Sequence, residues 1–417
     1  MRERTETAEV VVVGCGPGGA VLAYLLARSG IDVALVERAA TFEREYRGFG
    51  WNPGVVRLFD EMDLLDDVLD LAHETVTDGA FSLYGEEISV LDFDLLDTDY
   101  PYALMMEQPA LLECLVDRAS SYDNFTFHPS TTVRDVRTDT AGRIQGIEAR
   151  DRDAGEDVAF ETQCVVGADG RYSTVRTSAG IDPGLFESPV DLVWFKLPRG
   201  DIDATTQGRI DRDSVLLYFG LGGGDLQIGY LVRSGEWPSI KQAGFDAFRE
   251  RIAEIDPQVA SAMAAQLDGF RDTTLLDVAP GIADTWSSDG LLLIGDAAHT
   301  ASPIGAQGNP LAVEDAVIAH SLLVEELTIT EEILERLGEF GARRRPHVEQ
   351  IISRQRRGAA NLTYWLDYGG YVPPRLARGM AKTAPLIVPH SKSVRSTIET
   401  FALGDRSVSV DRSHFTD

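Results

Sequence analysis

The chain has 417 residues, and 67 Asp and Glu against 38 Lys and Arg give it a formal net charge of −29. Apolar residues make up 44% and charged residues 25%, which is a globular composition, and a chain of this length is expected to form two or more lobes. The acidic balance excludes nucleic-acid binding through a generally basic surface and argues against attraction to anionic lipid.

The cysteines and the apolar segments indicate the cellular setting. Cys15, Cys114 and Cys164 are far apart and have no metal-ligand spacing, so we expect a reducing, cytoplasmic environment rather than a disulfide framework. The charged start of the chain lacks the apolar region of a signal peptide, and no apolar stretch approaches about 18 residues, so no membrane span is expected. Only four cations are Lys, which fits either a coding bias or adaptation to a high-salt cytoplasm.

The first elements in chain order predict a parallel sheet. Residues 9–13 form a β-branched run that ends at glycine, residues 17–29 have an Ala/Leu-rich helical pattern, and residues 31–36 read as a second buried strand. Such a βαβ unit favours parallel strands. Residues 53–71 predict one amphipathic helix and residues 109–121 another.

The later part of the chain combines segments of antiparallel-sheet pattern with buried strands and helices. Residues 76–93 and 190–232 alternate apolar and polar side chains, which predicts antiparallel sheet with one wet face. Short strands are expected over 131–166, a buried strand at 291–294 and a helix over 310–326. A helical tail follows from residue 330. We interpret its arginines mainly as a solvated helix face: Arg343, Arg344, Arg345, Arg354, Arg356 and Arg357.

The sequence therefore predicts an α/β fold built from non-contiguous segments. A Rossmann-like nucleotide-binding lobe would comprise residues 1–75, 103–187 and 282–357. A mainly antiparallel β-sheet lobe that binds substrate would be inserted twice, as residues 76–102 and 188–281. Residues 358–417 would form a helical C-terminal tail.

A glycine fingerprint carries the strongest local signal. It reads Gly14-Cys15-Gly16-Pro17-Gly18-Gly19 and joins a strand to a helix. The first glycine allows the tight turn, the second lets the backbone approach a pyrophosphate, and the third lets helix and strand pack closely. The helix N-terminus then offers its partial positive charge to the phosphates. Glu37, at the end of the next strand, stands where an acid can bind ribose hydroxyls.

The glycine fingerprint alone does not separate FAD from NAD, and two acidic residues at strand ends help to make that distinction. Asp169 follows the strand Val165-Val166-Gly167 and precedes Ser173, and Asp296 follows the strand Leu293-Ile294. A carboxylate at the C-terminal end of a parallel strand lies at the crevice where α/β sheets hold ligands. Either Asp alone could simply cap a helix. Their occurrence together with the fingerprint favours a cofactor site.

With these three motifs, residues 8–357 resemble the single-component FAD-dependent aromatic hydroxylases of the para-hydroxybenzoate hydroxylase type. The resemblance implies that the nucleotide-binding lobe holds FAD. It implies FAD contacts at Gly14, Gly16, Pro17, Gly18, Gly19, Glu37, Arg38, Arg47, Gln108, Asp169, Asp296, Gly305, Gln307, Gly308 and Asn309.

The resemblance also implies catalytic positions. Arg47 would lie near flavin and substrate, and the backbone carbonyl of Pro303 would line the site beside the reactive flavin carbon. His299 could act as a base toward a phenol, although its Gly-Asp-Ala-Ala-His context favours a structural role. A helix that starts at about Asn309 would direct its N-terminal amides at reduced, anionic flavin.

The chain departs from the family at two positions in this segment. Many members have Gly-Gly-Gln-Gly-x-Asn, whereas this chain has Ala306 in place of the second Gly and Pro310 in place of the Asn. Proline at the first helical position is compatible with a helix start.

The implied reaction has two halves. NADPH or NADH reduces FAD, and O2 then forms a flavin C4a-hydroperoxide that transfers one oxygen atom to a small aromatic or planar hydrophobic substrate. Core packing competes with a substrate role for each apolar candidate, and strand alternation lets only about half of those in the inserted sheet face a pocket. The substrate candidates are Trp51, Trp194, Tyr218, Gln227 and Tyr230.

Three alternatives stay open. A flavin-dependent halogenase is only partly echoed by Trp194-Phe195-Lys196-Leu197-Pro198, and no Lys precedes Lys196. A flavin-dependent reductase of polyprenyl chains would need a long apolar tunnel. A flavin-binding sensor or assembly subunit would show no hydroxylase turnover. A homodimer is expected only from its general frequency.

Overall fold

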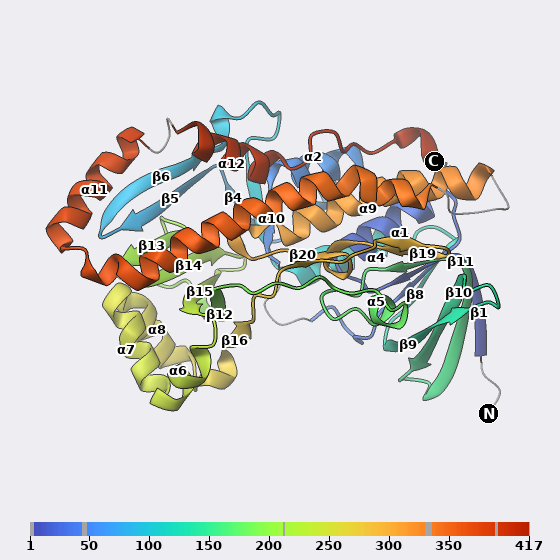
Figure 1. Cartoon of the computed structure of the whole chain (residues 1–417), viewed down its shortest axis with the longest axis horizontal. Coiled ribbons are helices and arrows are strands. Elements are labelled where there is room, and N and C mark those ends of the chain that lie inside the picture. The colour runs from blue at the N-terminus through green and yellow to red at the C-terminus, as the bar shows by residue number, and fades with distance from the viewer. Residues whose placement is uncertain (1–3, 44–47, 212, 330–335, 388–390, 417) are drawn as a thin grey trace.

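The chain folds into two lobes joined by one long helix (Figure 1). The computed structural model describes residues 4–43, 48–211, 213–329, 336–387 and 391–416. The predicted arrangement, a Rossmann-like lobe with an inserted antiparallel sheet and a helical C-terminus, is confirmed.

The first lobe is a sheet covered by helices. Its strand order is β18-β19-β11-β1-β2-β8, with β10 paired to the first half of β11 and β9 paired to β10. The neighbours are parallel from β19 to β8, as the βαβ pattern predicts. The strands are β1 (Arg4–Val13), β2 (Val33–Val36), β8 (Phe125–His128), β9 (Thr131–Thr138), β10 (Ile144–Asp151), β11 (Glu156–Gly167), β18 (Ser287–Ser288) and β19 (Leu291–Leu293).

Helices bury the apolar side chains of this sheet. The helix α1 (Pro17–Arg28) is buried almost throughout and packs against α4 (Gln108–Ala119) and α9 (Gly308–Ile329). A small sheet of β3 (Gly50–Trp51), β7 (Ala103–Met106) and β4 (His73–Val76) lies at its border. Short elements complete the lobe: α5 (Thr174–Ser178), β17 (Gly281–Ile282) and β20 (His299–Thr300).

The prediction of one helix over 53–71 is wrong. The segment forms α2 (Pro53–Glu61) and α3 (Leu65–Leu69), separated at Asp63, whose φ is +55°. Aspartate tolerates this left-handed conformation better than most side chains, so it can end one helix and start another. The apolar periodicity continues across the break because both helices bury the same side against one core.

The second lobe is a seven-stranded sheet with order β16-β12-β15-β14-β13-β5-β6. All neighbours are antiparallel except β13 and β5, which join the two inserted segments in parallel. The strands are β5 (Asp78–Leu83), β6 (Glu86–Asp92), β12 (Val190–Pro198), β13 (Gly208–Asp211), β14 (Ser214–Gly220), β15 (Asp225–Arg233) and β16 (Thr274–Leu276).

Three helices that the sequence analysis did not predict cover one face of this sheet. They are α6 (Trp237–Ala243), α7 (Phe245–Ile255) and α8 (Pro257–Gln266), and Figure 1 shows them below the strands. Their apolar side chains, including Phe248 and Met263, pack with those of β12, β14 and β15. The opposite face is directed at the first lobe.

The helix α10 (Leu337–Tyr368) spans both lobes, so the predicted boundary between residues 357 and 358 lies inside it. Its first half packs in the core of the first lobe, and Ala359 and Leu366 pack on the second sheet. The chain continues through α11 (Pro374–Ile387) to α12 (Lys392–Leu403), which returns to contact α2 (Figure 1). Among the helices of the described chain, none has both the length and the apolar character that crossing a bilayer requires.

Candidate active site

The glycine fingerprint forms a tight turn between β1 and α1. Gly14 has φ +103°, and a Cβ on Gly19 would lie 2.0 Å from the Gly14 carbonyl oxygen, so neither position accepts a side chain. A Cβ on Gly16, by contrast, would meet no described atom within 4 Å. The turn is therefore closed on its protein side and open at Gly16, which is the position expected to approach a pyrophosphate.

Glu37 lies beside this turn. Its buried carboxylate accepts hydrogen bonds from the backbone N–H groups of Cys15 and Ala39, both at 2.8 Å. The carboxylate thus fixes the fingerprint backbone from the next strand, at the place where a ribose is expected. Arg38 is exposed.

Asp169 caps a helix. Its carboxylate accepts hydrogen bonds from the Ser173 hydroxyl and from the backbone N–H groups of Thr174 and Val175, at 2.7 and 3.2 Å. This is the capping alternative that the sequence analysis kept open. Any contact with the cofactor would come in addition to this role.

A buried arginine that the sequence analysis missed supports both acidic strand ends. Arg176 donates a hydrogen bond to the carbonyl of Ala297 at 2.9 Å. Burial lowers the pKa of Arg176, while the charges of Asp169, Asp182 and Asp296 oppose that effect. The charges of both crevice carboxylates therefore act on the Arg176 guanidinium. Asp296 itself is half-buried in the turn after β19.

The segment expected at the flavin forms an exposed loop before α9. Gly305 and Ala306 have φ of +74° and +52°. Alanine in this left-handed region is strained by roughly 1 kcal/mol, and the family glycine at that position would not be. The carbonyl of Pro303 accepts a hydrogen bond from the Ala306 N–H at 3.0 Å. The helix α9 begins at Gly308, as predicted to within one residue.

Gln108 and Asn309 meet at one point of the site. Gln108 Nε2 donates a hydrogen bond to Asn309 Oδ1 at 3.3 Å. A Cβ on Gly48 would lie 2.4 Å from that oxygen, so the chain passes close to both amides. Arg47, one residue earlier, lies outside the described residues.

Gln355 of α10 holds the loop from behind, although the sequence gives it no motif. Its Oε1 accepts the Ser302 N–H at 3.1 Å, and its Nε2 donates to the carbonyls of Ser302 and Ile304, both at 2.8 Å. These bonds enclose Pro303 on both sides. The Gln355 side chain is buried. Its amide bonds the backbone N–H and C=O groups of a loop that has no neighbouring strand among the described residues to pair with.

The C-terminal segment also contacts the loop. The carbonyl of Phe401 accepts hydrogen bonds from Asn52 Nδ2 at 2.7 Å and from Gln307 Nε2 at 3.0 Å. A Cβ on Gly305 would lie 2.4 Å from the Phe401 ring. Gln307, predicted to contact cofactor, therefore directs its amide nitrogen at the C-terminal segment.

An aromatic cluster of Phe49, Trp194 and Phe219 lies on the face of the second sheet that is directed at the first lobe. Ring centroids are 5.4 Å apart for Phe49 and Trp194 and 4.8 Å apart for Phe49 and Phe219. Ile304 packs against the wider apolar cluster of this sheet face, to which Trp194 also belongs. The aromatic cluster thus faces the loop expected at the flavin.

The substrate candidates of the second sheet are divided between its two faces, and Trp51 lies in the first lobe. Gln227 is paired with Lys196 and Phe219 in the strand register and so shares the face of Trp194. Its Nε2 donates to the carbonyl of Phe195 at 3.2 Å. Trp51 is fully buried against Phe59 in the core of the first lobe.

Tyr218 and Tyr230 lie on the opposite face, in the core with α6, α7 and α8. The Tyr218 hydroxyl donates to Asp256 at 2.8 Å, and burial raises the pKa of Tyr218 well above its ordinary value. Tyr230 packs edge-on against Phe248. The structure does not bring these two tyrosines to the aromatic cluster.

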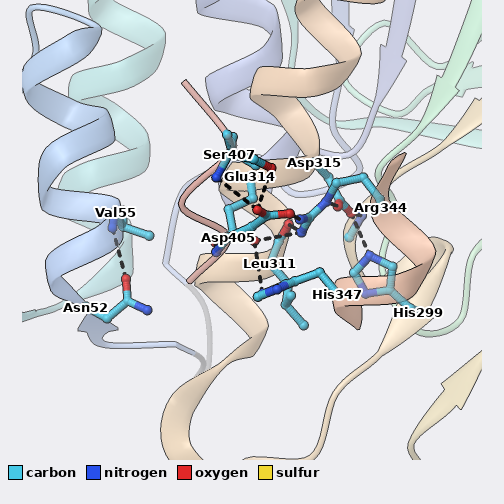
Figure 2. A network of polar contacts seen from close by, with 12 residues as sticks. Asn52, Val55, His299, Leu311, Glu314, Asp315, Arg344, His347, Asp405 and Ser407 are labelled. Atoms are coloured by element: carbon cyan, nitrogen blue, oxygen red, sulfur yellow. Dashed lines mark hydrogen bonds and ion pairs between the residues drawn. The ribbon is translucent and has the colours of Figure 1, made fainter. Parts of the chain in front are cut away.

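A buried network of charges lies behind the site (Figure 2). His299 Nε2 lies 2.6 Å from Asp315 Oδ2, which also accepts the Gly295 N–H at 2.8 Å. Burial alone raises the pKa of Asp315, but the charges of His299 and Arg344 outweigh it and hold that pKa well below its ordinary value. His299 therefore pairs with a buried carboxylate that also binds the turn after β19.

Arg344 corrects the prediction of a solvated arginine face. Its side chain is fully buried, with Nε 2.8 Å from Asp315 Oδ1 and Nη2 2.8 Å from Glu314 Oε2. A third carboxylate, Asp405, lies 3.4 Å away (Figure 2). The neighbouring Arg343 is exposed and pairs with Glu339, so adjacent arginines on α10 have opposite environments.

The residues at the crevice fit FAD. Gly16 opens onto space that a pyrophosphate can fill, and the Nδ2 atom of Asn309 is buried without a hydrogen-bond partner in the described chain. The N-terminus of α9 begins beside the exposed Gly305-Ala306 loop. Fingerprint, acidic strand ends and loop would hold pyrophosphate, ribitol and ring in that order.

Comparisons with known proteins agree with this site. Residues 7–355 match the family described as FAD binding domain. The chain is 34% identical to 6-methylpretetramide 4-monooxygenase of Streptomyces rimosus over 404 residues, which cover 96% of this chain and 94% of that protein.

Two solved structures share the fold. A probable FAD-dependent monooxygenase from Pseudomonas aeruginosa has a TM-score of 0.74 and 22% identity, covering 87% of this chain and 99% of that one. The p-nitrophenol 4-monooxygenase of Pseudomonas putida DLL-E4 has a TM-score of 0.73 and 21% identity, covering 97% and 100%. The chain belongs to the single-component FAD-dependent aromatic hydroxylase family of monooxygenases, and it is a flavin-dependent oxidoreductase.

Proposed function

We propose that this enzyme hydroxylates a small aromatic or planar hydrophobic substrate. NADPH or NADH would reduce bound FAD, and the flavin would then activate O2 as a C4a-hydroperoxide that transfers one oxygen atom. Among the relatives, 6-methylpretetramide 4-monooxygenase is named as a monooxygenase, which supports oxygen transfer by a chain 34% identical to it.

One observation carries the proposal. Phe49, Phe219 and Ile304, the last from the loop that contains Pro303, pack against one apolar cluster of the second sheet, to which Trp194 belongs. Aromatic rings bind planar apolar molecules by stacked and edge-on contacts. A substrate between cluster and loop would present its ring to the flavin.

The protein's own groups would position and shield the reactants. Gln355 fixes both sides of Pro303 through three hydrogen bonds, which holds the carbonyl of that residue in place. The amides at the start of α9 favour negative charge on the reduced ring. The aromatic cluster excludes water from the oxygen transfer.

Stopped-flow absorbance of the FAD-loaded protein tests the proposal. NADPH and NADH are mixed with it across a panel of phenols and polycyclic aromatics, and oxygen is added after reduction. We expect one substrate class to accelerate flavin reduction and to give a transient oxygenated-flavin band followed by a hydroxylated product. Reduction without any oxygenated-flavin band would overturn the proposed mechanism.

Two variants make the test specific to the site. Trp194→Leu should raise the KM for the aromatic substrate at least tenfold, because it removes the largest ring of the cluster. Tyr230→Phe is the matched control, since it changes an aromatic residue of the same sheet on the opposite face and should leave KM unchanged. Equal effects of both variants would place the substrate elsewhere.

The same experiment separates the alternatives. A halide-dependent product would indicate a halogenase, alkene reduction without O2 a reductase, and a flavin that no nicotinamide reduces a binding protein. Lys196, the lysine in the halogenase-like stretch, pairs with Glu107 and Asp225. An ammonium engaged by two carboxylates is poorly suited to carry a halogen.

A further inference from the structure

The segment from 368 to 398 has a charge opposite to that of the whole protein. It contains Arg375, Arg378, Lys382, Lys392 and Arg395 and no Asp or Glu, in a chain whose net charge is −29. Two of the four lysines of the protein lie here. This segment is therefore locally positive although the whole chain is strongly negative.

The helix α11 combines these cations with exposed apolar side chains. It packs on β6, and its Ala377 and Ala381 are buried. Its outer side carries Leu376 and Met380, which are four residues apart and 57% and 54% exposed. Figure 1 shows α11 at the far end of the second lobe, away from the sheet of the first.

Exposed tyrosines lie in the segment that leads into α11. Tyr371, just before α11, is 84% exposed, and Tyr364 and Tyr368 at the end of α10 are exposed with ring centroids 4.8 Å apart. Of the eight large apolar side chains exposed in the described chain, five lie between residues 364 and 380. Clustering of this kind marks an interaction surface.

The cations of α11 are available for an external partner. Within the described ranges, Arg375 and Arg378 have no ion pair. Lys382 lies 3.5 Å from Glu86, but its side chain is 66% exposed. Many other arginines of the protein, such as Arg343 with Glu339, are engaged by neighbouring acids.

We propose that the outer surface of α11 docks the enzyme on an anionic lipid bilayer. Leu376 and Met380 would enter the interface between headgroups and acyl chains, and Arg375, Arg378 and Lys382 would contact lipid phosphates beside them. An amphipathic helix with cations beside a row of apolar side chains lies in this way on membrane surfaces. The acids elsewhere on the protein are screened beyond about 8–10 Å at physiological salt, so the local charge decides the contact.

The charge pattern disfavours a second copy of the chain as the occupant. In a symmetric dimer the same patch of both subunits meets around the axis, which would bring the two sets of cations together. An acidic protein would satisfy the cations but would not need the protruding Leu376 and Met380. A bilayer satisfies both features.

Co-sedimentation of the full-length, FAD-loaded protein with vesicles tests this inference. We expect binding to vesicles of phosphatidylcholine and phosphatidylglycerol at physiological salt, where the acids elsewhere are screened, and at least tenfold weaker binding to pure phosphatidylcholine. The variant Arg375→Gln/Arg378→Gln/Lys382→Gln should weaken binding on the order of 100-fold. Leu376→Gln/Met380→Gln should weaken it as well, whereas a purely electrostatic contact would not respond.

A control variant carries the same charge change elsewhere. Arg134→Gln/Arg249→Gln/Arg271→Gln removes three cations that have exposed ion pairs, and it should bind vesicles as well as the parent. No binding to anionic vesicles at physiological salt would overturn the proposal, as would equal loss of binding in both triple variants. If vesicles do not bind, two other results would assign the surface to a different partner. Salt-sensitive binding of an acidic protein would assign it to such a protein, and loss of a dimer in the α11 variant would assign it to a second copy of the chain.

Discussion

Replacing Arg344 by methionine should destabilise the protein more than any other single arginine substitution on α10. Methionine keeps most of the side-chain volume but leaves three carboxylates, Glu314, Asp315 and Asp405, without the cation that lies 2.8–3.4 Å from them. Removing one partner of a buried ion pair costs about 3–5 kcal/mol. That is a large part of the roughly 5–15 kcal/mol by which domains are stable.

Arg343→Met provides the matched control. It makes the same chemical change one residue away, where the guanidinium lies 2.8 Å from Glu339 and both side chains are about half exposed. An exposed pair of this kind contributes about 0.3–0.5 kcal/mol. The two variants should therefore differ in the free energy of unfolding by at least about 2.5 kcal/mol.

Urea unfolding followed by circular dichroism and by flavin fluorescence measures both effects. Because Asp315 also binds the Gly295 N–H next to Asp296, Arg344→Met should weaken FAD affinity as well. Arg344→Lys should restore part of the stability, since it returns the charge without the forked geometry. A loss below about 1 kcal/mol for Arg344→Met, or a loss equal to that of Arg343→Met, would refute the argument that this network stabilises the fold.

Further outcomes follow from single positions. Gly16→Val should fold but release FAD, whereas Gly19→Val should fail to fold because its Cβ would lie 2.0 Å from a carbonyl oxygen; yellow, folded protein from either would contradict this. Ala306→Gly should raise the free energy of unfolding by roughly 0.5–1 kcal/mol in urea titrations, since φ there is +52°. Burial lowers the pKa of His320 to about 3 in the folded protein. Below pH 6.5 the unfolded chain therefore binds a proton that the folded chain does not, so the free energy of unfolding falls as the pH drops below 6.5. His320→Gln should flatten the pH profile of the melting temperature. Gln355→Met should release more hydrogen peroxide per nicotinamide oxidised with unchanged reduction rate, and equal coupling would refute its positioning of Pro303.

The part of the site that is local in sequence could be predicted. A glycine turn, a strand end and a helix start each bring their neighbours into place within a few residues, so Gly16, Asp296 and the start of α9 could be recognised as a pattern. The same local logic failed over 53–71, where Asp63 turns the chain into a second helix that shares the apolar side of the first.

The parts that join distant segments could not be located from motifs. Gln355 lies about 50 residues from the loop it holds, and Phe401 belongs to a segment beyond the family match. One signal was available. Arg344 and Gln355 stand in helical spacing with the buried residues Phe340, Val348 and Ile351, and that spacing predicts an inward side chain whatever its polarity.

The length of α10 has a consequence for how this active site can diversify. A single helix of 32 residues measures roughly 48 Å. It contacts both the loop expected at the flavin and the sheet face that carries the aromatic cluster. Inserting one residue near its middle would rotate everything beyond by about 100°, turning Ala359 and Leu366 away from the sheet. Deletions and insertions there should therefore be lethal to the site, and descendants of this enzyme would acquire new substrates by exchanging side chains on the wall rather than by altering the spacing between its halves.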